Sequence, residues 1–147
     1  MNEDTSDGRL TVVNEMKQED WQIISTNLRN FNIEQSGGLS IKPEVSINLT
    51  LKTDDGEVVG GLRSRAIYQC LNIDHIWVDE EWRKIGYGRS LLWIAERLAR
   101  KEGCIAANTS SYSFQAHGFY EKYGYKTVGV FEEYPDGIKK FFLEKKL

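Results

Sequence analysis

Hydrophobic and polar positions alternate with a period of two in several short segments, and they follow a helical period in two longer ones. Residues 45–53 (VSINLTLKT) place four aliphatic side chains on one face and polar side chains on the other, which predicts a half-buried strand. Residues 54–56 (DDG) predict a hairpin turn, and residues 57–68 the returning strand. The Gly60-Gly61 pair inside that strand predicts a bulge or a close approach of another group to the backbone.

The helical period appears first in residues 17–35, where Trp21, Ile24, Leu28 and Phe31 share one face. A second helix is predicted over about 89–101, and a short third one over 114–123. Further strands are predicted over residues 10–14, 71–78, 104–109, 125–132 and 139–144. The order β-α-β-β-β-α-β-α-β-β predicts an α/β fold, with a mixed sheet covered by helices on both faces. We expect one domain over residues 1–147, with residues 1–9 as a flexible tail.

Residues 71–98 organise the rest of the chain, because a strand there leads through a glycine-containing turn into a helix. The first amides of a helix lack intrahelical partners and carry partial positive charge, so such a turn is suited to binding an anion. Gly86 and Gly88 would let a phosphate approach the backbone, and Arg83, Lys84 and Arg89 add positive charge. The P-loop pattern is absent, and Leu91 occupies the place of the third glycine of a dinucleotide-binding fingerprint.

The remaining pattern, Arg-x-x-Gly-x-Gly over residues 83–88, resembles the pyrophosphate loop of the GCN5-related N-acetyltransferase (GNAT) superfamily. A second stretch, residues 116–125 (AHGFYEKYGY), resembles a later signature of that family and lies where the family places it. The resemblance implies the GNAT acyl-CoA N-acyltransferase fold, with a mixed, mostly antiparallel sheet. It also implies transfer of the acetyl group of acetyl-CoA, as cosubstrate, to a primary amine of a small molecule or protein. The alternative is a non-catalytic module that binds acyl-CoA as a sensor or interaction domain.

By the same resemblance, the donor is held by the end of the 71–78 strand, by the glycine loop and by the second signature. The residues expected to bind it are Ile76, Trp77, Val78, Arg83, Lys84, Ile85, Gly86, Tyr87, Gly88, Arg89, Ser90, Ser113, Ala116 and Phe119. Ser113 departs from the asparagine that is common at its position in the family, and Gln115 is a further candidate contact.

Two residues are candidates for the proton transfers of the reaction. Tyr120 matches the tyrosine that many family members use as general acid toward the coenzyme sulfur, and a phenol is a plausible donor to a thiolate. Asp74 is the candidate general base, because a period of two places Asn72, Asp74, Ile76 and Val78 on one face of the strand. His75 has the wrong parity for that face and is expected to be a packing residue. Aromatic residues expected to line the acceptor groove are Phe31, Tyr68, Tyr112 and Tyr134.

Composition and charge narrow the range of partners. A net charge of −3 gives no reason to expect nucleic acid or an anionic membrane as partner. The chain has no apolar run long enough to span a bilayer, and its acidic, polar start is unlike a signal peptide, so we expect a cytoplasmic protein. Two scattered cysteines and two histidines predict buried thiols rather than a metal site. Dimers are common in the family, so the resemblance is compatible with a homodimer.

Overall fold

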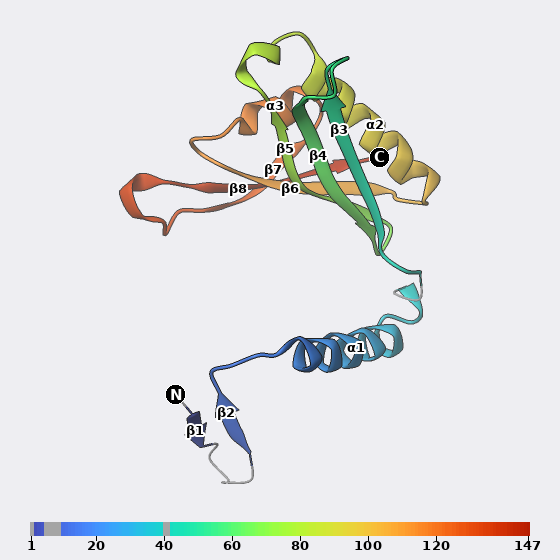
Figure 1. The fold of residues 1–147 in the computed structure, drawn as a ribbon, viewed down its shortest axis with the longest axis vertical. Helices are drawn as coiled ribbons and strands as arrows, with labels where there is room; N and C mark the ends of the chain where they lie inside the picture. Colours follow the sequence, from blue (N-terminus) through green and yellow to red (C-terminus); the bar gives the residue numbers. More distant parts are fainter. Residues whose placement is uncertain (1, 5–9, 40–41) are drawn as a thin grey trace. The chain divides into compact units, whose positions relative to one another are not determined.

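The computed structural model describes residues 2–4, 10–39 and 42–147, and the chain divides into two compact units, Met1–Ile41 and Lys42–Leu147. The first unit contains β1 (Asn2–Asp4), β2 (Thr11–Val13) and α1 (Gln18–Gln35) (Figure 1). The second contains β3 (Val45–Lys52), β4 (Val58–Ile67), β5 (Cys70–Val78), α2 (Tyr87–Lys101), β6 (Ala106–Tyr112), α3 (His117–Lys122), β7 (Lys126–Phe131) and β8 (Lys140–Lys146). Short 3-10 turns, η2 (Glu80–Trp82) and η3 (Pro135–Gly137), follow β5 and β7.

The first unit confirms the predicted helix and one predicted strand. The amide of Lys17, at the start of α1, donates to Asp20 Oδ2 at 2.9 Å, and Gly37 and Gly38 follow the helix with φ of +61° and +91°. β2 pairs antiparallel with β1 in a two-stranded sheet. Asn2–Asp4 thus form a strand where a flexible tail was predicted, and residues 1 and 5–9 lie outside the described residues.

The second unit is built on a six-stranded sheet with the order β3-β4-β5-β6-β8-β7. Every neighbouring pair is antiparallel except β5 and β6, whose parallel pairing needs the crossover through α2. The predicted mixed, mostly antiparallel sheet is therefore confirmed. No helix in the described part of the chain combines the length and apolarity needed to cross a membrane.

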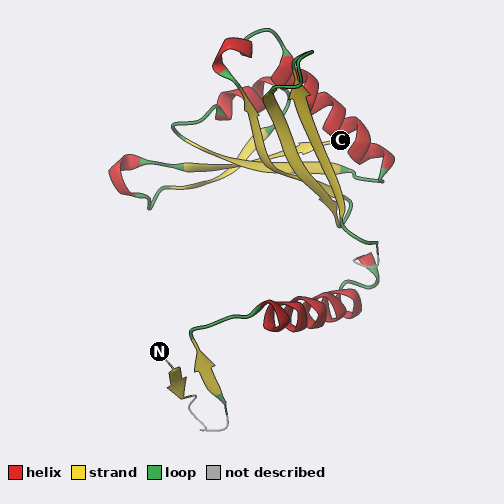
Figure 2. Ribbon diagram, in the orientation of Figure 1, coloured by secondary structure: helices red, strands yellow, loops and turns green. Residues whose placement is uncertain are grey.

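One face of this sheet carries the core. Aliphatic residues of β3, β4 and β5 pack there against the buried side of α2, including Leu91, Leu92 and Ala95. Figure 2 shows α2 running along these strands. Tyr120 of α3 belongs to the same cluster. Both helices of the second unit therefore pack on the same face, and helical cover of the other face stays a prediction.

The glycine pair in β4 sits at a bulge, as predicted. The register between β3 and β4 shifts after Leu51, opposite Gly60. A Cβ on Gly60 would lie 2.8 Å from the Trp77 carbonyl oxygen, and one on Gly61 would lie 2.7 Å from the Leu49 carbonyl oxygen. Neighbouring strands thus approach the β4 backbone too closely for any side chain.

The third helix starts later than its sequence pattern predicted, at His117 rather than at residue 114. A turn occupies the preceding residues, because the Gln115 amide donates to the Tyr112 carbonyl and the Gln115 side chain accepts from the Tyr112 amide, both at 2.9 Å. Gly124, with φ of +92°, ends this region of the chain, as predicted. β6 likewise begins at Ala106, two residues after its predicted start.

Candidate functional site

A fork between β5 and β6 opens at one end of the sheet. The two strands pair only from Cys70↔Ala106 to Ile73↔Thr109, although β5 continues to Val78 and β6 to Tyr112. Beyond the fork β5 stays with β4, while β6 pairs with β8 to its end, so the two halves of the sheet diverge (Figure 1). The edge of β5 that faces β6 therefore carries no ladder to β6 after Ile73, which leaves its backbone for an extended ligand.

The glycine loop follows β5 and ends at the N-terminus of α2. Gly86 is the residue before the helix, with φ of +103° and no capping side chain, and the first turn contains no acidic residue. The amides of Tyr87, Gly88 and Arg89 open the helix, where partial positive charge favours an anion. Ser90 differs from them, because its amide already donates to the Gly86 carbonyl at 3.0 Å. A contact between Ser90 and a bound anion would therefore have to come from the Ser90 hydroxyl.

The two loop glycines are required for different reasons. Nothing lies within 4 Å of a Cβ placed on Gly86, so its glycine is needed for the left-handed backbone. A Cβ on Gly88 would lie 3.2 and 3.3 Å from two atoms of the Phe119 ring. Gly88 thus makes room for Phe119, which joins the two sequence signatures at one contact. The sequence pattern had instead predicted that the missing side chain at Gly88 lets a phosphate approach the backbone.

One of the charged side chains of the loop helps to hold the loop in place. Arg83 Nε donates to the Val78 carbonyl at 2.8 Å, which ties the loop to the end of β5. Lys84 has a left-handed backbone with φ of +64°, and Ile85 is exposed. Arg83, Lys84 and Arg89 are all solvent-exposed beside the helix start. Trp77 is also exposed, whereas Ile76 and Val78 pack against the core.

Tyr120 lies on the core face at the base of the fork. Its side chain is 5% exposed and lies close to Thr109, the last β6 residue that pairs with β5. The Thr109 hydroxyl in turn donates to the Ile73 carbonyl at 3.0 Å. Burial raises the pKa of Tyr120 above its ordinary value. The phenol is therefore protonated at neutral pH.

A bulge in β5 overturns the predicted face of Asp74. The register shifts between Arg63↔His75 and Ser64↔Ile73, so Asp74 is an extra residue without a partner on β4. After the bulge Ile76 and Val78 point to the core, whereas Asn72 and Asp74 do not. The prediction that these four residues share one face was wrong, because a single extra residue reverses the alternation.

The same bulge changes the assignment of His75. His75 pairs with Arg63, whose side chain is exposed on the face away from the core, so His75 lies on that polar face. Asp74 is there too, and its two oxygens accept from Arg65 Nε and Nη2, each at 3.2 Å. This pair raises the pKa of Arg65. The prediction that His75 and Asp74 lie on different faces of the strand was therefore wrong. The Asp74 carboxylate is already paired with Arg65.

The second signature contributes one residue against the loop and two near the end of β6. Phe119 packs on Gly88, and Ala116 precedes α3 and is exposed. The Ser113 hydroxyl accepts from the Lys139 amide at 3.1 Å, and the Ser113 amide donates to the Lys139 carbonyl at 2.8 Å. Ser113 therefore joins β6 to β8, and its contact with a donor stays a prediction.

The predicted acceptor residues are only partly brought together. Tyr112 and Tyr134 have hydroxyl oxygens 3.4 Å apart, and Phe114 stacks on Tyr112 with ring centroids 5.3 Å apart. The Tyr112 hydroxyl raises the pKa of Tyr134. Tyr68 lies in the turn between β4 and β5, at the other end of β5 from Val78, and nine strand residues at about 3.3 Å each separate the two ends. Phe31 belongs to α1 in the first unit, so its role stays a prediction.

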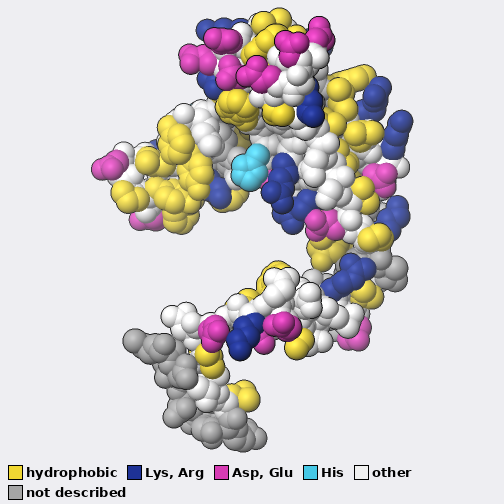
Figure 3. Space-filling view, viewed as in Figure 1, with side chains coloured by type: hydrophobic (Ala, Val, Ile, Leu, Met, Phe, Trp, Pro, Cys, Tyr) yellow, Lys and Arg dark blue, Asp and Glu magenta, His cyan; other side chains and the backbone are white. Residues whose placement is uncertain are grey.

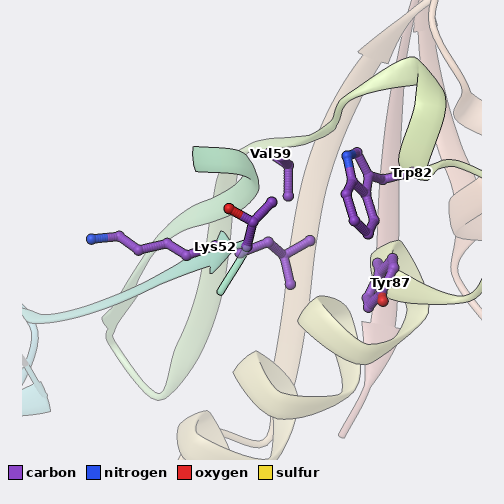
Figure 4. Close-up of a pocket in the computed structure, with 6 residues that line it drawn as sticks. Lys52, Val59, Trp82 and Tyr87 are labelled. Carbon is purple, nitrogen blue, oxygen red and sulfur yellow. The ribbon is translucent and has the colours of Figure 1, made fainter. Parts of the chain in front are cut away.

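A small pocket lies behind the loop, on the side of β3. Leu51, Lys52, Thr53, Val59, Trp82 and Tyr87 line it (Figure 4). The rings of Trp82 and Tyr87 are 6.1 Å apart at an angle of 59°.

Sequence reasoning missed Thr109. The burial of Ala107 and Ser111 places Thr109 on the core side by alternation, and a polar residue on that side was the available signal. Its importance comes from its two partners, Ile73 on the neighbouring strand and Tyr120 on the following helix, which a local pattern does not reveal.

Comparison with known proteins gives concordant matches. The model of the acetyltransferase (GNAT) family matches residues 12–125. A blasticidin-S acetyltransferase from Streptomyces morookaense is 41% identical over 93 residues, which are 63% of this chain and 68% of that protein. The crystal structure of an acetyltransferase from Bacillus cereus aligns with a TM-score of 0.78 and 32% identity over 92% of this chain and 97% of the other. A Bacillus anthracis structure in complex with acetyl coenzyme A shares the fold, with a TM-score of 0.63 and 18% identity over 72% of this chain and 64% of the other.

Proposed function

This chain is an acyltransferase of the acetyltransferase (GNAT) family, and we propose that it transfers the acetyl group of acetyl-CoA to a primary amine of a small molecule. The observation that carries this proposal is the fork between β5 and β6, because Tyr120 lies close to Thr109 at the point where the strands part. A donor threaded into the fork would bring its thioester to a buried, protonated phenol.

The residues around the fork fit a long, anionic donor. The amides of Tyr87, Gly88 and Arg89 would bind the diphosphate, and the backbone of Ile76–Val78 would pair with the extended arm. The exposed side chains of Lys84 and Arg89 add charge complementarity, while Arg83 holds the loop on Val78. Acetyl-CoA, once bound, supplies an acetyl group activated as a thioester.

Tyr120 is proposed as the general acid. Acetyl transfer breaks the carbon–sulfur bond and leaves a thiolate, which must receive a proton. The apolar surroundings that raise the pKa of Tyr120 also disfavour an unprotonated sulfur, so proton transfer from phenol to thiolate stays accessible.

Two features support a small, cationic acceptor. The Streptomyces morookaense relative is named for the acetylation of blasticidin S. On this chain Tyr112 and Tyr134 form an aromatic pair beyond the fork. Glu133 and Asp136 on the neighbouring hairpin are exposed, whereas Glu132 is paired with Lys139. Aromatic rings edged by carboxylates complement an amine in its charged, resting form.

The proposal is tested first by donor binding and thiol release. Acetyl-CoA at saturating concentration is expected to raise the melting temperature, because it binds the folded state preferentially. Release of free thiol should then depend on an added amine, with blasticidin S, spermidine and lysine methyl ester as the first panel. Binding of acetyl-CoA without amine-dependent thiol release would favour the sensor alternative, and absence of any melting shift would refute both.

Replacement of Tyr120 by Phe tests the acid. The Tyr120→Phe variant is expected to lose about 100-fold in kcat with little change in the Kd for acetyl-CoA, because the proton donor is lost while the ring still fills its site. Tyr123→Phe is the matched control, since Tyr123 is on the same turn and packs against Phe119. Equal activity of the two variants would end the assignment of Tyr120.

A further inference from the structure

The fork has two faces, and the proposed proton donor Tyr120 lies on only one of them. Tyr120 and Thr109 lie on the core face. In acetyl transfer the amine nitrogen attacks the carbonyl as the carbon–sulfur bond breaks, so one group must take a proton from nitrogen while another gives a proton to sulfur. The acceptor side of the reaction is therefore expected on the opposite, polar face, where the residues of β4 and β5 point to solvent.

His75 is carried to this polar face by the β5 bulge. It lies two residues beyond Ile73, the last β5 residue paired with β6, and its strand partner is Arg63. Its side chain is exposed. Figure 3 views this side of the sheet and shows basic side chains gathered over β4 and β5, beside the hydrophobic tip of the β7–β8 hairpin.

The other charged or titratable groups around this position are poorly suited to accept a proton. Arg63 and Arg65 on β4 are cations at all working pH values. Both oxygens of Asp74 are engaged by Arg65, and Glu44 lies 3.7 Å from the same guanidinium. Tyr112 and Lys140 lie across the fork, and the Lys140 ammonium group lies over the Tyr112 ring. An imidazole is the side chain that ordinarily changes charge near neutral pH.

We propose that His75 is the general base of this acetyltransferase, an inference that rests on the proposed function. The neutral imidazole takes a proton from the acceptor amine as the nitrogen–carbon bond forms. The carbon–sulfur bond breaks, its electron pair leaves with sulfur, and the thiolate takes the phenolic proton of Tyr120. His75 then releases its proton to solvent, and Tyr120 regains one, so no further reactant is needed. Acid and base act from opposite faces of the fork.

Substitution of His75 tests the role through the pH dependence of the rate. With blasticidin S as acceptor, His75→Gln is expected to lower kcat about 100-fold, since general base catalysis typically contributes 10²–10⁴-fold. The wild-type kcat should rise with pH, as expected for a general base, and this rising limb should vanish in the variant. Added imidazole should restore activity to His75→Ala. Arg63→Gln is the matched control on the same face, and it should keep the limb.

A donor-binding measurement keeps the inference testable if blasticidin S is not a substrate. The His75 imidazole signals, assigned in NMR spectra with the His75→Gln variant, are expected to shift on saturation with acetyl-CoA. If the wild-type protein does not acetylate blasticidin S, that result counts against blasticidin S as the acceptor and not against His75. His75 signals unmoved by acetyl-CoA, or a His75→Gln variant with wild-type kcat and pH limb, would overturn the role of His75.

Discussion

At the scale of single residues, the glycine loop shows that one motif can satisfy two physical needs. Gly86 supplies a backbone conformation with φ of +103°, and Gly88 supplies space for the Phe119 ring. The Arg-x-x-Gly-x-Gly pattern therefore encodes the turn that exposes the helix amides, and it also encodes the contact between the two signatures. The motif predicts a phosphate-binding site, yet its second glycine, Gly88, is also required for packing against Phe119.

Alanine at each glycine separates these needs. Gly86→Ala is expected to cost about 1–3 kcal/mol in the free energy of unfolding, because a left-handed backbone strains any side chain. Gly88→Ala should cost about 1 kcal/mol and weaken acetyl-CoA binding, since the Phe119 ring must shift. Gly118→Ala is the control, because Gly118 has neither a positive φ nor a close neighbour. Urea unfolding measures all three, and a Gly118→Ala cost as large as that of Gly86→Ala would contradict this account.

At the scale of elements, a buried charge joins α2 to the strands beneath it. Glu96 is 3% exposed, and its two oxygens accept from Lys145 of β8, each at 2.8 Å. The Tyr125 hydroxyl donates to the same carboxylate at 3.1 Å, and Arg100 lies 3.8 Å from it. These contacts tie α2, which packs on β3, β4 and β5, to β8 as well.

Removal of the partner cation should be costly. Lys145→Met is expected to lower the free energy of unfolding by about 3 kcal/mol, because it leaves the Glu96 carboxylate buried and underpaired. The double variant Glu96→Gln, Lys145→Met should be more stable than the sum of the two single changes predicts. Chemical denaturation of the four proteins measures this coupling. Strict additivity would show that the ion pair contributes nothing specific.

At the scale of the whole second unit, one core face holds two buried tyrosines next to each other. Tyr120 and Tyr125 have ring centroids 5.5 Å apart. Burial raises the pKa of both, and the Glu96 charge raises the pKa of Tyr125 further. The folded protein thus retains two protons that the unfolded chain releases near pH 10.

Stability should therefore fall at alkaline pH. Above about pH 10 the unfolded state binds fewer protons than the folded state, so the free energy of unfolding decreases by up to about 1.4 kcal/mol per pH unit for each tyrosine. The loss ends only when the folded state releases its own protons. Urea unfolding between pH 8 and 11 measures the slope. Tyr125→Phe should give a shallower decline, and an unchanged slope in that variant would contradict the assignment.

The sequence by itself determined the features that depend on near neighbours in the chain. The β3–β4 hairpin, the glycine loop and α2 were predicted, because alternation, turn residues and helix-start chemistry are local properties. Only the tertiary structure decided which face each residue of β5 presents. The bulge at Asp74 does leave a signal in the sequence, because Asp74 and His75 interrupt the alternation between Ile73 and Ile76. Only the pairing with β4 shows that Asp74 is the extra residue. The face that His75 presents and the contact of Phe119 with Gly88 likewise follow from contacts between residues far apart in the chain.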